Sequence, residues 1–170
     1  MHIFLTGDVQ CGKSTVIRRA LEMIDRPVYG FRTLFTNRKD DHKALYMLPA
    51  SYQGEPQQMH IVTQFDCGRP HVLTERFDAL GSSLLKEAQT HPEGLILMDE
   101  CSRFERDALL FQQEILRCLD GDIPVLGVVR LTAEGWVDQI RNHPKVRLIT
   151  VTLENRDTLP QQVANLLLQA

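Results

Sequence analysis

The stretch from Gly7 to Thr15 holds the residues of this chain best suited to binding phosphate. It reads G-D-V-Q-C-G-K-S-T and fits the spacing G-x-x-x-x-G-K-[ST] of a phosphate-binding loop, or P-loop. Glycines let such a loop turn so that consecutive backbone N–H groups point inward at phosphate oxygens. Lys13 supplies a positive charge for the outer phosphates, and the Ser14 hydroxyl can ligate magnesium. The pattern therefore predicts that the chain binds a nucleoside triphosphate. The residues expected to contact it are Gly7, Asp8, Val9, Gln10, Cys11, Gly12, Lys13, Ser14 and Thr15.

Further candidates for chemistry follow apolar runs later in the chain. Asp99 and Glu100 come directly after the run 95–98. We expect Asp99 to support a magnesium ion, because a hard cation prefers oxygen ligands. We expect Glu100 to orient or deprotonate a water molecule that attacks the γ-phosphate. Arg130 follows the run 125–129 and is suited to offsetting charge on the transferred phosphoryl group, although a surface ion pair fits it equally well.

Asn155 and Arg156 complete the candidate site. They follow the last apolar run of the chain and are weaker candidates, as contacts to the nucleotide base or phosphates. The six histidines show no spacing typical of metal ligands.

These residues need a scaffold that brings distant segments together, and the sequence predicts one. Strands are expected at 3–5, 28–36, 95–98, 125–129 and 146–151, and helices at about 13–24, 75–90, 133–141 and 158–168. Ser102 and Glu105 have the spacing of a capping box, which predicts a further helix from residue 102 with Phe104, Ala108 and Phe111 on its buried face. Strands that alternate with helices predict an α/β fold with a mainly parallel sheet. In such a sheet ligands bind at the carboxyl ends of the strands, where the candidate residues lie.

Residues 37–75 interrupt the alternation. A polar turn is expected at 37–43, a short apolar segment at 44–48, a loop at 49–58 and a strand at 59–62. We interpret 37–75 as a β-rich insertion, with a hairpin pair beside the main sheet. The 170 residues are otherwise expected to form a single domain, 1–170.

Composition excludes several classes of protein. Hydrophobic residues make up 43%, and the net charge of −3 argues against a nucleic-acid partner. No apolar run reaches the roughly 18 residues that a membrane span needs, and the N-terminus leaves no room for a signal peptide. The four cysteines show no metal-binding or disulfide spacing, so we expect reduced thiols and a cytoplasmic protein. The sequence leaves the oligomeric state open, with a monomer possible.

Taken together, these segments resemble the small P-loop nucleoside-triphosphatase family known from thermophilic microbes and as the human cancer-related nucleoside-triphosphatase. The segments that carry the resemblance are 3–15, Gly30–Thr33, Phe77–Gly81, Leu95–Glu100, Arg130 and Val151–Asp157. The resemblance implies a RecA-like, three-layer fold and slow, base-tolerant hydrolysis of ATP, GTP and other triphosphates. Asp8 and Gln10 stand where the family has proline or glycine, and Cys101 and Ser102 replace the last two residues of its D-E-I-G.

Three functions fit this sequence. The first is magnesium-dependent hydrolysis of nucleoside triphosphates. The second is a small-molecule or nucleotide kinase, for which an arginine-rich lid is expected, whereas the insertion holds only Arg38 and Arg69. The third is a nucleotide-dependent switch without catalysis, whose loops change order when the γ-phosphate is lost.

Overall fold

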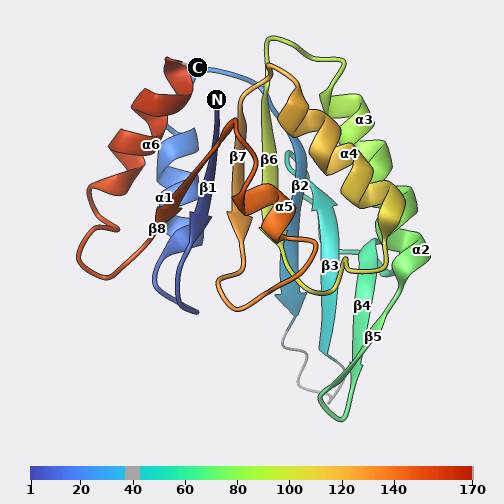
Figure 1. Ribbon diagram of the computed structural model, residues 1–170. Coiled ribbons are helices and arrows are strands. Elements are labelled where there is room, and N and C mark those ends of the chain that lie inside the picture. The colour runs from blue at the N-terminus through green and yellow to red at the C-terminus, as the bar shows by residue number, and fades with distance from the viewer. Residues whose placement is uncertain (37–42, 170) are drawn as a thin grey trace.

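The computed structural model describes residues 1–36 and 43–169 (Figure 1). Among these residues, eight strands form one sheet in the order β5-β4-β3-β2-β6-β7-β1-β8. The parallel part consists of β2 (Val28–Thr36), β6 (Leu95–Cys101), β7 (Val125–Val129), β1 (His2–Thr6) and β8 (Val146–Thr150). The strands β3 (Lys43–Pro49), β4 (Ile61–Asp66) and β5 (Arg69–Val72) continue the sheet from β2 in antiparallel pairing.

Helices cover both faces of the sheet and give three layers. The described helices are α1 (Lys13–Leu21), η1 (Gln58–His60), α2 (Thr74–Arg76), η2 (Phe77–Gly81), α3 (Ser82–Ala88), α4 (Leu109–Asp120), α5 (Asp138–Arg141) and α6 (Leu159–Leu168). One face packs against α1 and α6, and the other packs against α3 and α4 (Figure 1). The predicted α/β class with a mainly parallel sheet is confirmed.

The central strands are buried because they are apolar on both faces. Ile3 and Leu5 of β1 belong to the core shared with α1 and α6, while Phe4 between them belongs to the core shared with α3 and α4. This alternation follows from the pleat of a strand. Gly127 of β7 makes room for Phe4, since a Cβ at position 127 would lie 2.3 Å from the Phe4 ring. The apolar runs of the central strands therefore serve two cores at once.

Parallel pairing brings the carboxyl ends of β1, β6, β7 and β2 to one edge of the sheet, the lower edge in Figure 1. β1 leads into the P-loop at this edge. β6 extends to Cys101, so Asp99 and Glu100 lie within the end of the strand. Arg32 of β2 is the register partner of Asp99, and β7 ends at Val129, directly before Arg130. The sheet thus gathers four chain segments at the place where the sequence predicts a ligand.

The predicted start of helix α4, at Ser102, is wrong. Glu105 does reach back to Ser102, accepting hydrogen bonds from its backbone N–H (2.9 Å) and its hydroxyl (3.2 Å). Ala108, however, has φ −87° and ψ 74°, which is not helical, so the segment forms a turn and α4 begins at Leu109. Asp78 of η2 caps α4 instead, because its Oδ1 accepts a hydrogen bond from the N–H of Phe111 (3.0 Å).

Two other predicted helices differ from the structure. The helix predicted at 133–141 shortens to α5, Asp138–Arg141, because Gly135 has φ +86° and Asp138 Oδ2 accepts a hydrogen bond from its N–H (3.0 Å). The segment predicted as helix 75–90 is helical from Thr74 to Ala88 but contains the π-helical turn η2.

The predicted insertion, 37–75, is β-rich in its described part. Its strands extend the main sheet and do not form a separate pair beside it. The predicted strand 59–62 begins only at Ile61, since Met59 and His60 belong to η1. Strand β5 was not predicted, because it contains Pro70, yet an edge strand tolerates proline. The polar turn expected at 37–43 lies, up to residue 42, outside the described residues.

Within residues 1–36 and 43–169, no helix is long and apolar enough to cross a membrane.

Candidate active site

The P-loop and the ends of β2, β6 and β7 surround a cavity of about 540 Å³. The residues that line it are Gly7, Asp8, Val9, Gln10, Gly12, Lys13, Ser14, Thr15, Thr33, Phe35, Asp99, Glu100, Arg130, Leu131 and Thr132. The structure thus brings together Lys13 with Ser14, Asp99 with Glu100, and Arg130, which the sequence predicts to act on one substrate.

Glycines shape the P-loop at two points. Gly7 has φ +141°, and a Cβ at this position would lie 2.5 Å from the carbonyl oxygen of Val151. Gly12 has φ +111° and stands immediately before α1, and among the described residues no side chain caps this helix. The first N–H groups of a helix have no partner within it, so they are available to an anion and carry the positive end of the helix dipole. This end of α1 opens on the cavity, because Gly12, Lys13 and Ser14 line it.

Backbone carbonyl oxygens of the P-loop hold the Lys13 side chain over the loop. Its Nζ donates hydrogen bonds to the carbonyl oxygens of Gly7 (2.9 Å) and Asp8 (2.6 Å). Triphosphate oxygens are competing acceptors of higher charge for the same ammonium group. The lysine is therefore placed to exchange carbonyl contacts for phosphate contacts.

The two carboxylates at the end of β6 lie in a partly buried, mutually repelling pair. Burial raises the pKa of Asp99 to about 6, with a further contribution from the charge of Glu100, while Arg32 and Lys13 act in the opposite direction. Burial also raises the pKa of Glu100, and Arg130 and Lys13 lower it. A carboxylate held away from bulk water beside a phosphate site is suited to accept a proton.

Arg130 is paired with Glu100. Its Nη1 lies 3.4 Å from Glu100 Oε1, and both side chains retain contact with solvent in the cavity. Of the two sequence interpretations of Arg130, the structure shows an ion pair, and a charge that acts at the reaction site stays a prediction. The ion pair exists, and its acid is the candidate general base.

Ser14 and Asp99 provide a donor set that fits magnesium. Both line the same cavity, one with a hydroxyl and the other with a carboxylate, and hard cations take oxygen ligands. Protein sites for Mg²⁺ beside phosphates commonly use one or two such side chains, with waters and phosphate oxygens completing the shell.

Four residues of the cavity wall were not predicted as site residues: Thr33, Phe35, Leu131 and Thr132. Thr33 is the most informative, because its hydroxyl accepts a hydrogen bond from the backbone N–H of Glu100 (3.2 Å). The available signal was the position of Leu131 and Thr132 directly after Arg130, at a strand end. Thr33 and Phe35 lie within β2 and give no such signal.

Three predicted residues do not line the cavity. Cys11 is buried beneath the loop, with its Sγ 3.7 Å from Lys13 Nζ. Asn155 closes the turn after β8: its Oδ1 accepts from the Thr152 N–H (2.8 Å), and its Nδ2 donates to the Thr150 oxygen (2.9 Å). Arg156 lies against Gly12, with its Cδ 3.2 Å from where a Cβ of residue 12 would stand. Arg156 therefore borders the P-loop from outside the cavity.

Comparison with known proteins places this geometry in a family. A family model described as NTPase matches residues 2–164. The chain is 26% identical to the nucleoside-triphosphatase THEP1 of Natranaerobius thermophilus, over 96% of this chain and 94% of that one. It superimposes on the crystal structure of THEP1 from Aquifex aeolicus with a TM-score of 0.79, at 23% identity and covering 98% and 99% of the two chains. The solution structure of a human cancer-related nucleoside triphosphatase gives a TM-score of 0.70 at 26% identity, over 99% and 98%. The resemblance seen in the sequence is confirmed, and the chain belongs to the NTPase family.

Proposed function

We propose that this protein hydrolyses nucleoside 5′-triphosphates, ATP and GTP among them, to the diphosphate and inorganic phosphate in the presence of magnesium. The observation that supports this most strongly is the convergence of Lys13, Ser14, Asp99, Glu100 and Arg130 on one cavity of about 540 Å³. The names of its curated relatives, nucleoside-triphosphatase, agree with this proposal.

The P-loop holds the substrate in the proposed reaction. Its inward N–H groups and the start of α1 bind the β- and γ-phosphates, and Lys13 neutralises part of their charge. Ser14 and Asp99 hold the magnesium ion, which when bound withdraws electron density from the phosphate oxygens. We propose that Asn155 and Arg156, on the segment between β8 and α6, meet the nucleotide from the side of the P-loop with little selectivity for the base.

Glu100 and Arg130 serve the chemical step. Glu100 takes a proton from a water molecule, whose oxygen forms a bond to the γ-phosphorus. The bond from that phosphorus to the bridging oxygen breaks, and the nucleoside diphosphate leaves with the electron pair. Arg130 lies beside the carboxylate and offsets the charge that spreads over the transferred group. General-base assistance of this kind is typically worth about 10²–10⁴ in rate.

We further propose that the activity belongs to a single domain, 1–170, acting in the cytoplasm. All four cysteines are free thiols, and this agrees with a reducing compartment.

The test is release of inorganic phosphate from each triphosphate with magnesium and without any acceptor. We expect slow release that collapses in Lys13→Ala and falls at least roughly tenfold in Glu100→Gln. Lys86→Ala and Glu87→Gln, on α3 and remote from the cavity, are matched controls that keep full activity. Release that requires an added acceptor would indicate a kinase, and nucleotide binding without any turnover would indicate a switch.

A further inference from the structure

A second, smaller cavity of about 270 Å³ adjoins the proposed catalytic cavity. It lies where the end of β2, strand β4 and the segments after β6 and β7 meet. We call it the aromatic recess and define it by Phe35, Phe65, Phe104, Arg103, Arg130 and Thr132. Phe35, Arg130 and Thr132 line both cavities, so the recess opens directly beside Glu100.

Three phenylalanines form the apolar wall of the recess. The ring centroids of Phe35 and Phe65 are 5.7 Å apart, and those of Phe65 and Phe104 are 5.9 Å apart. Phe104 is almost fully buried, whereas Phe35 exposes 49% of its surface at the mouth. The Phe35 ring is tilted by 50° from Phe65, and Phe65 meets Phe104 nearly edge-on at 84°. Because Phe35 is half exposed, a further ring can stack or pack edge-on against it. The wall therefore suits a flat, unsaturated group.

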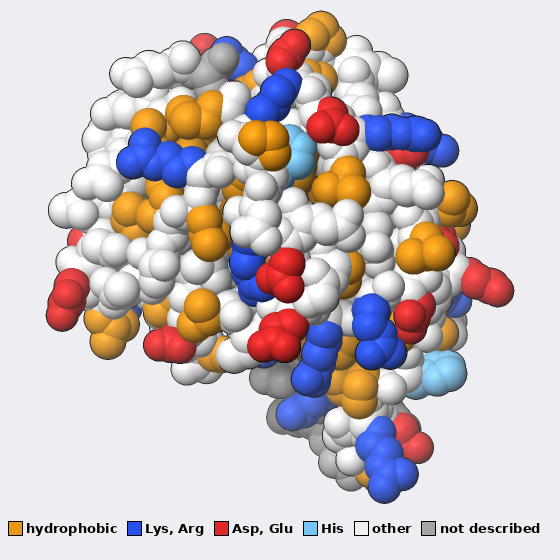
Figure 2. All heavy atoms as spheres, in the orientation of Figure 1, with side chains coloured by type: hydrophobic (Ala, Val, Ile, Leu, Met, Phe, Trp, Pro, Cys, Tyr) orange, Lys and Arg blue, Asp and Glu red, His pale blue; other side chains and the backbone are white. Residues whose placement is uncertain are grey.

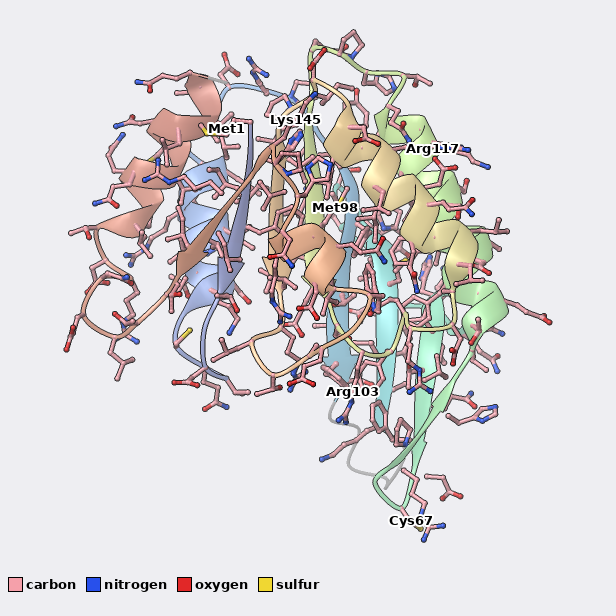
Figure 3. All side chains as sticks on the ribbon, viewed as in Figure 1. Met1, Cys67, Met98, Arg103, Arg117 and Lys145 are labelled. Carbon is pink, nitrogen blue, oxygen red and sulfur yellow. The ribbon has the colours of Figure 1, made fainter. Side chains whose placement is uncertain are left out.

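Two arginines line the recess beside this wall. Arg103 lies over the Phe104 ring, with its Cζ 5.5 Å from the centroid, and Arg130 reaches Glu100 at 3.4 Å. Figure 3 labels Arg103 at the lower, carboxyl edge of the sheet. Figure 2 shows Lys and Arg side chains beside hydrophobic ones on this lower part of the molecule. Within the described residues, no carboxylate lies within ion-pair distance of Arg103. A planar guanidinium group next to an aromatic face matches a carboxylate or phosphate attached to a ring.

We infer that the aromatic recess is a second ligand site, which takes a small molecule made of a planar ring and one anionic group while the triphosphate occupies the P-loop. The ring packs against Phe35 and Phe65, and the anion pairs with Arg103. A volume of about 270 Å³ is near the lower limit for ligand pockets, so the enclosed part of the ligand is a single ring system. The inference rests on the proposed function only in assigning the larger cavity to the triphosphate.

Binding is tested with three probes that separate the two halves of the ligand. AMP carries a ring and an anion, adenosine carries the ring alone, and ribose 5-phosphate carries the anion alone. Each is titrated by calorimetry into protein saturated with magnesium and a non-hydrolysable ATP analogue, so that the P-loop is filled. We expect one saturable site for AMP, with affinity at least tenfold higher than for either partial probe.

Two exposed positions test the location without disturbing the core. Phe35→Ala and Arg103→Ala are each expected to weaken AMP binding at least tenfold, with AMP titrated at a saturating concentration of the ATP analogue for each variant. Arg103→Ala, which does not line the catalytic cavity, should also leave binding of the ATP analogue in place. Arg106→Ala, an exposed arginine on the same segment that does not line the recess, is the control and should bind AMP as the original protein does.

The outcomes distinguish this inference from the proposed function. Absence of saturable AMP binding to protein that holds the ATP analogue overturns the recess as a ligand site, and so does binding that survives both substitutions unchanged. Phosphate release by the unmodified protein is measured separately. Absence of release overturns the proposed hydrolysis and leaves the binding result standing.

Discussion

The backbone N–H of Glu100 donates a hydrogen bond to the hydroxyl of Thr33, 3.2 Å away, and so joins the end of β6 to β2 at the cavity. Thr33→Val keeps the shape of the side chain and removes this acceptor. The hydrogen bond is worth about 1 kcal/mol, so we expect kcat for triphosphate hydrolysis to fall about fivefold, with KM little changed because Thr33 positions the carboxylate. Steady-state phosphate release measures both constants. Thr33→Ser keeps the hydroxyl and should restore kcat; equal rates for the Val variant and the original protein would contradict the positioning role.

Arg130 contributes a charge at a distance of 3.4 Å from Glu100. Arg130→Ala removes the group that offsets charge on the transferred phosphoryl, and we expect kcat to fall by roughly 10²-fold. Arg130→Lys keeps the charge without the planar donor pair and should recover only part of the loss. Single-turnover hydrolysis measures this step directly. Arg69→Ala, on the remote strand β5, is the control, and a loss of similar size there would remove the specific role of Arg130.

Asp78 supports α4 from another helix. Its Oδ1 accepts a hydrogen bond from the N–H of Phe111, in the first turn of α4. Asp78→Ala removes this cap and should lower the free energy of unfolding by about 1 kcal/mol. Urea denaturation followed by circular dichroism measures this change. Glu75→Ala, an exposed neighbour in α2, should change stability by less than about 0.5 kcal/mol. Equal losses in the two variants would show that the cap has no specific effect.

His2 makes stability depend on pH with a definite sign. Burial lowers the pKa of His2 in the folded protein to about 4, from an ordinary value of 6.5, while its Nε2 bonds the Leu119 oxygen at 2.9 Å. Below pH 6.5 the unfolded chain binds a proton at His2, whereas His2 in the folded protein binds one only near pH 4. Acid therefore favours unfolding. The contribution of His2 to the free energy of unfolding should therefore fall by roughly 3 kcal/mol as pH drops from 7 to 4.

The difference in unfolding free energy between the original protein and His2→Gln isolates this group. That difference should grow as pH rises from 4 to 6.5 and stay constant above. A flat difference over this range would mean that the burial of His2 does not control its protonation.

Glu105 makes the free energy of unfolding depend on pH in the direction opposite to His2. It is 1% exposed, and burial raises its pKa to about 7 in the fold, from an ordinary value of 4.5. Its contribution to stability is complete below pH 4.5 and is lost as pH rises through 7, by roughly 3 kcal/mol. Glu105→Gln is uncharged at every pH, so the difference between the original protein and this variant should shrink as pH rises from 4.5 to 7. A flat difference over this range would show that the buried carboxyl group is already ionised in the fold.

Much of the fold and of the candidate site followed from sequence, because both depend on strand ends. The spacing of the P-loop places Lys13 and Ser14, and the apolar runs before Asp99 and Arg130 place these residues at the same edge of a parallel sheet. Local pattern alone was sufficient for this. The predicted chemical roles of these residues stay predictions until the assays above are made.

The residues that were missed depend on tertiary structure. Thr33 reaches Glu100 only because β2 and β6 are neighbours, and no local pattern determines which strands pair. The Ser102–Glu105 spacing was interpreted as a helix start, although both residues are buried in a turn that Trp136 also stabilises by donating its Nε1–H to the Ser102 oxygen at 2.7 Å. Phe35 and Phe65 are adjacent only through the antiparallel extension of the sheet.

The hairpin of β4 and β5 ends at Cys67, which Figure 3 shows beyond the lower edge of the sheet. Cys67 is exposed, whereas Cys11, Cys101 and Cys118 are buried. A maleimide dye will therefore attach at one place on the native protein without any engineered cysteine. Because Phe65 lies two residues away on the same hairpin, the dye would be carried by the element that supplies one side of the recess.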